Sequence, residues 1–176
     1  MAAIERDGEA RTGVRVTVDG SGTAAVGTGL PVLDHLLGLL AVNGGFDIAL
    51  EVEPGSAVME ASAAGHALGR ALAEPLRNGR RHGAAVVPAD EALANVALEA
   101  SGRPLLVSNV DLSDARVAGL ETDIVARFLE GLTEGAGLTL HVRLLEGRDT
   151  QHVLDAIFKA LGVALAVACR ARPRKE

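Results

Sequence analysis

Three ionisable side chains recur at helical spacing in the segment DTQHVLDAIFKAL, residues 149–161. His152, Asp155 and Lys159 stand three and then four residues apart, which places them in one stripe on an α-helix. An imidazole and a carboxylate one turn apart can bind a divalent metal together. The alternative is a solvated pair on the surface of the helix. A metal site would need further ligands from other parts of the chain.

Three cations are candidates for an anion site. Arg81 in RRHG and Arg103 in SGRP lie near predicted turns, and Lys159 lies on the polar stripe. Arginine holds phosphate through two parallel hydrogen bonds, whereas lysine acts as a point charge. The alternative is that they are ordinary surface cations among the 17 Lys and Arg residues. The sequence contains no P-loop, dinucleotide-binding or nucleophile-elbow motif.

The elements that must position these side chains follow from apolar periodicity. Helices are predicted over 30–45, with Pro31 in the first turn, over 58–76, closed by Pro75, and over 122–137 and 149–170. Residues 13–28 alternate around a turn at Asp19-Gly20, which predicts a β-hairpin. Further strands are predicted over 46–52 and 138–147, and two apolar runs occupy 92–112.

The second half of the chain repeats the order of elements in the first. Gly45 matches Gly137, Leu37 matches Leu129, and FDIALEV matches LTLHVRL, all at an offset of 92 residues. We therefore predict an α+β fold built from duplicated β-β-α-β-α halves, with two sheets backed by helices. Residues 1–176 form one domain, with halves at about 11–86 and 87–170 and a basic tail at 171–176.

Composition narrows the class of protein. The chain has 176 residues, 48% of them hydrophobic, and a mean hydropathy of +0.26, values typical of a folded globular protein. A net charge of −6 argues against general nucleic-acid binding, and we expect no membrane span. Because the chain has no Trp or Tyr and only three Phe, close approach of its elements must fill the core. Its single cysteine, Cys169, excludes an internal disulfide and fits a reducing cytoplasm, and its apolar surroundings predict an inert thiol.

Four segments together resemble the imidazoleglycerol-phosphate dehydratases of histidine biosynthesis. They are DGSGTAAVGTGLPVLDHLLGLLAVNGGFDIAL, VPADEAL, ALEASGRPLL and GLTLHVRLLEGRDTQHVLDAIFKALGVAL. The resemblance covers about residues 11–169. It implies the duplicated fold, trimers that assemble into a cage of twenty-four, and sites between subunits. It also implies a pair of manganese ions that bind the imidazole ring while water is eliminated.

The ligand positions that this resemblance implies are only partly occupied by ligands. His35 is the histidine of the LDH motif. The adjacent histidines of the first HHxxE motif fall on Val58 and Met59, and its glutamate falls on Ser62. The histidine that precedes the family's FF pair falls on Arg127.

The second HHxxE motif reads Gln151, His152 and Asp155. The remnant ligand positions are therefore His35, His152 and Asp155, so no resident metal is expected. The family's phosphate-binding cations, by contrast, are all matched in position, by Arg81, Arg103 and Lys159.

Three hypotheses about function follow. The first is a homologue with a degraded dimetal site, inactive or repurposed to bind a phosphorylated metabolite, or a partner that co-assembles with a true dehydratase. The second is an active dehydratase whose manganese site is atypical or completed by a partner subunit. The third is a purely structural subunit of an oligomer. A homo-oligomer, as a trimer or a cage of trimers, is expected in each case.

Overall fold

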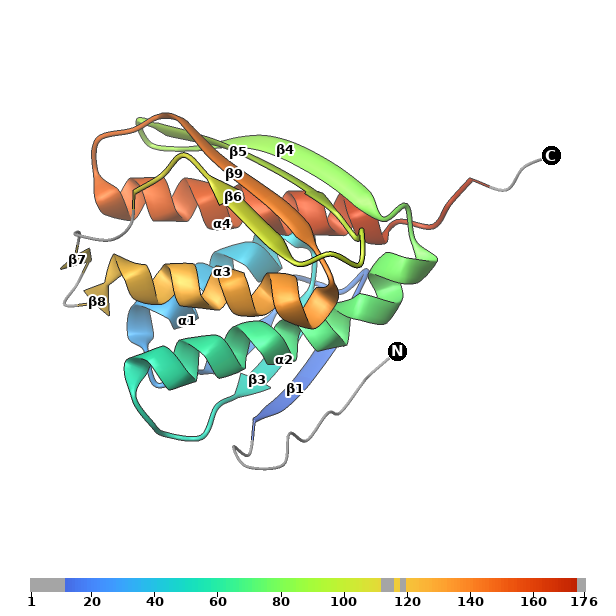
Figure 1. Ribbon diagram of the computed structural model, residues 1–176, viewed down its shortest axis with the longest axis horizontal. Helices are drawn as coiled ribbons and strands as arrows, with labels where there is room; N and C mark the ends of the chain where they lie inside the picture. The colour runs from blue at the N-terminus through green and yellow to red at the C-terminus, as the bar shows by residue number, and fades with distance from the viewer. Residues whose placement is uncertain (1–11, 112–115, 118–119, 174–176) are drawn as a thin grey trace.

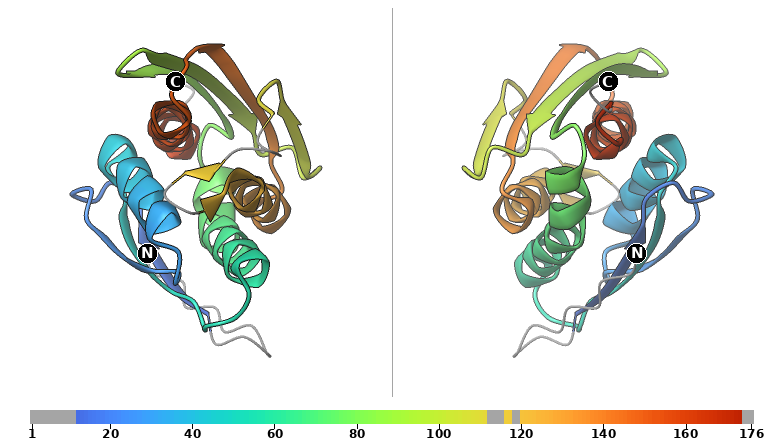
Figure 2. Two further views of the ribbon diagram at one scale, coloured as in Figure 1. Left: turned by 90° about the vertical axis from the view of Figure 1, so that its left-hand side faces the viewer. Right: turned by 90° about the vertical axis from the view of Figure 1, so that its right-hand side faces the viewer.

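The computed structural model describes residues 12–111, 116–117 and 120–173. A layer of four helices lies between two mixed sheets (Figure 1; Figure 2). The helices are α1 (Pro31–Gly44), α2 (Ala57–Asn78), α3 (Thr122–Ala136) and α4 (Thr150–Cys169). This architecture confirms the predicted α+β class, with two sheets backed by helices.

The two sheets share one pattern of strand pairing. The first has the order β1-β3-β2, and the second has the order β4-β5-β9-β6. In the first sheet β3 pairs antiparallel with β1 and parallel with β2, and in the second β9 pairs antiparallel with β5 and parallel with β6. The strands are β1 (Gly13–Thr17), β2 (Ala24–Gly27), β3 (Asp47–Glu51), β4 (His82–Ala89), β5 (Ala92–Glu99), β6 (Leu105–Ser108) and β9 (Thr139–Glu146), together with the short pair β7 (Arg116–Val117) and β8 (Leu120–Glu121).

The hairpin predicted over residues 13–28 is wrong, because β3 lies between β1 and β2. The carboxylate of Asp47, at the start of β3, explains the different path. It accepts hydrogen bonds from the backbone N–H groups of Ser21 and Thr23 at 2.9 and 3.0 Å, and from the Ser21 hydroxyl. These bonds, that of Thr23 first, lower the pKa of Asp47. They hold residues 21–23 at the start of β3, so the chain crosses this strand instead of folding back on β1.

The duplication is visible in the backbone. Gly45 ends α1 and Gly137 ends α3, both with φ of 68° in the left-handed region that favours glycine. Leu37 and Leu129, each eight residues before the glycine that ends its helix, are both buried. Residues that match in the sequence at an offset of 92 therefore also occupy matching places in the two helices.

Glycines bring the helices close together. A Cβ atom added to Gly65 of α2 would lie 2.2 Å from the carbonyl oxygen of Phe128 in α3. A Cβ atom on Gly162 of α4 would lie 2.3 Å from the carbonyl oxygen of Leu40 in α1. Backbones at these contacts leave no room for a methyl group. Close approach, as predicted from the lack of aromatic residues, packs the middle layer.

Two local predictions differ from the structure. Pro75 lies inside α2, which continues to Asn78, because the fully buried Leu76 in the last turn compensates for the one hydrogen bond that proline removes. Strand β4 was not predicted, and it spans the expected boundary between the halves at 86 and 87.

Helix α4 is long and apolar enough to cross a membrane, with a mean hydropathy of 1.8. It is, however, the central helix of this protein, with 61% of its apolar window buried. It packs against β4 and β5 on one side and against α1 on the other. Burial in the core accounts for its apolar composition.

Candidate functional site

His35 and Asp155 lie side by side where α1 crosses α4. The start of α1 is fixed by Asp34, whose carboxylate accepts from the backbone N–H and the hydroxyl of Thr28. The Nε2 atom of His35 lies 3.1 Å from Oδ1 of Asp155. The side-chain amide of Gln151 donates to the same oxygen at 2.7 Å. Two of the three remnant ligand positions therefore meet, but they bond to each other and to an amide.

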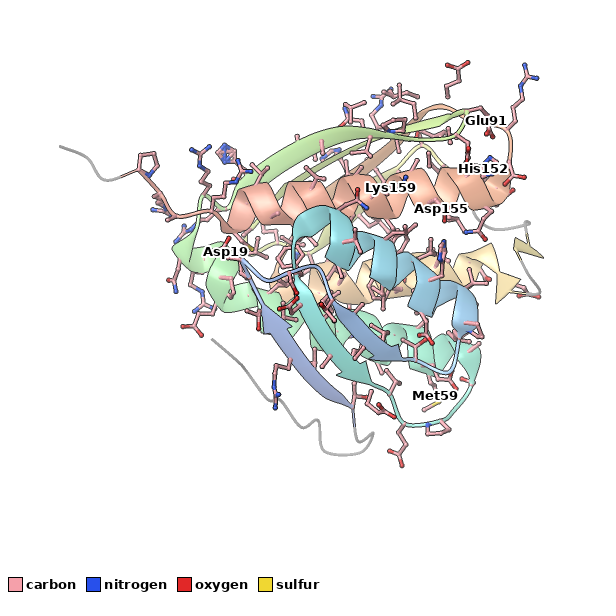
Figure 3. The ribbon with its side chains drawn as sticks, turned by 180° about the vertical axis from the view of Figure 1, so that it is seen from behind. Asp19, Met59, Glu91, His152, Asp155 and Lys159 are labelled. Atoms are coloured by element: carbon pink, nitrogen blue, oxygen red, sulfur yellow. The ribbon has the colours of Figure 1, made fainter. Side chains whose placement is uncertain are left out.

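His152 faces a different set of groups at the start of α4. Its Nδ1 atom lies 2.6 Å from Oε2 of Glu91, and its Nε2 atom lies 3.4 Å from Oδ2 of Asp90. Asp149 caps the helix by accepting from the backbone N–H of His152 at 3.1 Å. His152 and Asp155 share α4 (Figure 3), but they bond to different residues: Asp155 contacts His35, and His152 contacts Glu91.

The contact between His152 and Glu91 shifts both pKa values. Backbone N–H donation from Asp149, followed by the hydrogen bond from His152, lowers the pKa of Glu91 to about 2. The hydrogen bond to Glu91 raises the pKa of His152 above its ordinary value of 6.5. A metal ligand must be a neutral imidazole with a free lone pair. A carboxylate on one ring nitrogen is, however, also the usual partner of a histidine whose other nitrogen binds a metal.

The positions of the first HHxxE motif are apolar and exposed. The side chains of Val58 and Met59 stand in the first turn of α2, where the residues are 47% and 64% exposed. The hydroxyl of Ser62 lies 3.4 Å from Nδ1 of His66. Met59 lies well away from His152 in this chain (Figure 3). Valine and methionine offer a hard divalent cation no oxygen or nitrogen donor.

Arg127, at the position of the remaining family histidine, forms a salt bridge of 3.2 Å with Glu130. Its positive charge would repel a bound cation. Across the described ranges, no group of three or more His, Cys, Asp or Glu side chains is arranged to hold a metal. At three of the positions where the resemblance implies ligands, Val58, Met59 and Arg127, this chain therefore offers no metal donor.

The three predicted phosphate-binding cations are divided between two places. Arg81, with φ of 71°, precedes β4, and its carbonyl accepts from the backbone N–H of Ala100 at 2.7 Å. Arg103 lies in the turn after β5, so both arginines stand at one end of the second sheet. The backbone of Arg81 donates to Ala168, nine residues beyond Lys159, or about 13 Å along α4.

No sequence motif predicts Glu91 and Asp90 as partners of His152. Glu91 lies 61 residues before His152 in the chain, so no local spacing connects them. Both acids occupy the turn between β4 and β5, where Asp90 has φ of 50°. Because β4 itself was not predicted, this turn could not be placed beside α4.

Comparison with known proteins supports one family. The model of the imidazoleglycerol-phosphate dehydratase family matches residues 28–165. Imidazoleglycerol-phosphate dehydratase of Syntrophobacter fumaroxidans is 46% identical over 168 residues, which is 92% of this chain and 85% of the relative. Imidazoleglycerol-phosphate dehydratase of Moorella thermoacetica is 40% identical over 185 residues, which is 99% of this chain and 93% of the relative.

The solved structures agree with the sequence relatives. The crystal structure of imidazoleglycerol-phosphate dehydratase from Staphylococcus aureus matches with a TM-score of 0.87 and 30% identity, covering 98% of this chain and 99% of that one. That of the Pyrococcus furiosus protein matches with a TM-score of 0.81 and 31% identity over 93% of this chain and 92% of that one. The family match and the shared fold together show that this chain belongs to the imidazoleglycerol-phosphate dehydratase family.

Proposed function

We propose that this chain has lost the manganese-dependent dehydration of its family and binds a phosphorylated metabolite. The observation that carries the proposal is the pair Val58 and Met59, two exposed apolar side chains where the first metal-binding motif falls. Arg127, a cation where the family has a histidine, supports it further. The remaining histidines act as hydrogen-bonding groups between elements.

The energetics of the family reaction argue in the same direction. A pair of Lewis acids stabilises the charge that develops on an imidazole ring during elimination. Even a hundredfold loss in rate corresponds to about 2.7 kcal/mol of lost transition-state stabilisation. Replacement of most ligands of both ions removes a larger share of that stabilisation. In this proposal the chain therefore carries out no step that depends on the two ions.

A second candidate is an active imidazoleglycerol-phosphate dehydratase with an atypical metal site or one completed by a partner subunit. The 46% identity to the Syntrophobacter fumaroxidans enzyme over 92% of this chain favours it. Manganese would be its cofactor. In that case His35, His152 and Asp155 would first have to exchange their present partners for the metal.

Turnover of imidazoleglycerol phosphate in the presence of Mn²⁺ separates the two candidates. The Syntrophobacter fumaroxidans enzyme is the positive control. We expect the wild-type chain to be at least a hundredfold slower. The matched variant restores the family's ligands by Val58→His, Met59→His, Ser62→Glu, Arg127→His, Gln151→His and Asp155→Glu, and should recover measurable turnover. Wild-type turnover within tenfold of the control would establish the second candidate instead.

We further propose that the protein is a cytoplasmic homo-oligomer, as a trimer or a cage of trimers, like the family that it resembles. Four large apolar side chains on strands of the second sheet are between 41% and 54% exposed, and contact with another copy would cover them: Val86, Leu105, Val107 and Leu145. Co-assembly with an active dehydratase is a variant of this proposal, because a partner of the same fold would offer the same surfaces.

A further inference from the structure

The linker from α2 to β4 runs beside the residues that follow α4. The backbone N–H of Arg80 donates to the carbonyl of Arg170 at 2.9 Å, and Gly79 pairs with Ala171. The ends of α2 and α4 and the start of β4 consequently meet (Figure 1). This arrangement gathers an arginine cluster of five residues, Arg77, Arg80, Arg81, Arg170 and Arg172.

Three acids lie near the arginine cluster: Glu74 in α2, Glu99 opposite His82, and Asp19, whose charge adds to burial in raising the pKa of Cys169. In the described part of the chain, no salt bridge joins any of the five to a carboxylate. Two helix C-termini meet here, and each contributes about half a negative charge. The five guanidinium groups are nevertheless free of carboxylate partners in the described part of the chain. Such groups favour an anionic ligand.

A groove adjoins the cluster where the edge strand β4 crosses the last turn of α4. Its volume is about 430 Å³, and it is open to solvent. Arg80 and His82 form its polar side. The rest of its lining is apolar and mostly small, consisting of Gly83, Ala84, Ala97, Leu98 and Val167. A flat ring can lie on such a floor, and arginine can also stack on aromatic rings.

We propose that the groove and the cluster together bind a small anion that carries a planar ring, the chemical class of a nucleoside monophosphate. The ring would lie on the apolar floor, and the phosphate would contact Arg80 and Arg170. The site shares only Arg81 with the predicted phosphate-binding cations, and the side chain of Arg81 donates to the carbonyl of Arg77 at 3.1 Å. Arg103 and Lys159 do not line the groove.

Calorimetric titration with adenosine monophosphate, inorganic phosphate and adenosine tests the proposal. We expect adenosine monophosphate to bind at least tenfold more tightly than either of its parts. The double variant Arg80→Ala with Arg170→Ala should weaken its binding at least tenfold. Arg148→Ala, which removes one charge at the opposite end of α4, is the matched control and should bind as the wild type does. Binding of adenosine monophosphate that is lost in Lys159→Ala but kept in the double variant would place the ligand at the phosphate site of the proposed function and would overturn this proposal.

Three further results would overturn the proposal. In the first, phosphate alone binds as tightly as adenosine monophosphate. In the second, Arg148→Ala weakens binding as much as the double variant. In the third, a single-stranded oligonucleotide binds with an affinity that rises with its length, which would make the cluster a nucleic-acid surface. If the double alanine variant does not fold, Arg80→Lys with Arg170→Lys replaces it. This variant keeps the charge but not the paired hydrogen bonds, so binding should weaken at least threefold, and unchanged binding would also refute the site.

Discussion

Both ring nitrogens of His152 face carboxylates of this chain, although its position is that of a family metal ligand. His35 likewise contacts Asp155. At the scale of single residues, the chemistry of a retained side chain therefore depends on its neighbours more than on its position in a motif. The same reasoning makes the contact between His152 and Glu91 a sensitive probe of the account.

The stability that this contact adds should depend on pH in two directions. The raised pKa of His152 means that its share is present below pH 6.5 and is lost as pH rises through the folded-state value. The lowered pKa of Glu91 means that its share is present above pH 4.5 and is lost as pH falls towards about 2. The loss of melting temperature in Glu91→Gln should therefore be largest near pH 5.5 and smaller at pH 9.

The control for this experiment is Asp90→Asn, because Asp90 is 71% exposed and lies farther from the ring, at 3.4 Å. It should change the melting temperature much less at every pH. Titration of His152 by NMR gives the second readout, with a pKa that falls in Glu91→Gln. An unchanged His152 pKa in that variant would show that the contact does not form in solution.

Arg103 provides a second test at the scale of residues. An anion at the proposed phosphate site should stabilise the fold by about 2.7 kcal/mol at a hundred times its dissociation constant. Arg103→Ala should remove most of that gain, because paired hydrogen bonds to a charged group are among the stronger contacts. Thermal melts with phosphate, sulfate and imidazoleglycerol phosphate measure this. Equal shifts in both proteins, or no shift in the wild type, would mean that Arg103 is an ordinary surface charge.

At the scale of elements, glycines decide how close the helices come. Gly65 of α2 faces the backbone of Phe128, whereas a Cβ atom on Gly38 of α1 would meet nothing within 4 Å. The two positions are therefore a matched pair for one substitution. Both lie in helices, where alanine is intrinsically favoured over glycine by about 1 kcal/mol.

Gly65→Ala should lower the free energy of unfolding by about 2 kcal/mol, because overpacking costs more than the helix propensity gains. Gly38→Ala should raise the same free energy by up to about 1 kcal/mol. Urea denaturation at one fixed protein concentration measures both. Equal effects at the two positions would contradict the close contact of α2 with α3.

The elements also show how far the sequence predicts the structure. Apolar periodicity and the caps at Gly45 and Gly137 were sufficient for the helices and the repeat, because these signals are local. The position of β3 between β1 and β2 was not predictable in the same way, because side-chain bonds from Asp47 to residues more than twenty positions earlier determine it. For the same reason, the sequence identifies His35, His152 and Asp155 as candidate residues, but it does not predict which side chains they contact.

At the scale of the whole molecule, exposed apolar side chains on the second sheet predict self-association. Val86 and Leu145 are 54% and 50% exposed. We expect light scattering to give a mass that is a multiple of 18.0 kDa at micromolar concentration. Val86→Lys with Leu145→Lys should reduce that mass, whereas Arg148→Ala should not. A monomer of 18.0 kDa in the wild type would refute the proposed oligomer.

The manganese content of the purified protein tests the central claim most directly. The measurement is elemental analysis of protein purified with Mn²⁺ present, expressed as ions per chain, with the Syntrophobacter fumaroxidans enzyme analysed in parallel. Because Val58, Met59 and Arg127 supply no ligand, we predict far less than two ions per chain in the wild type. The variant with restored ligands should hold more. A content of about two ions per wild-type chain would contradict the loss of the metal site and favour an active dehydratase.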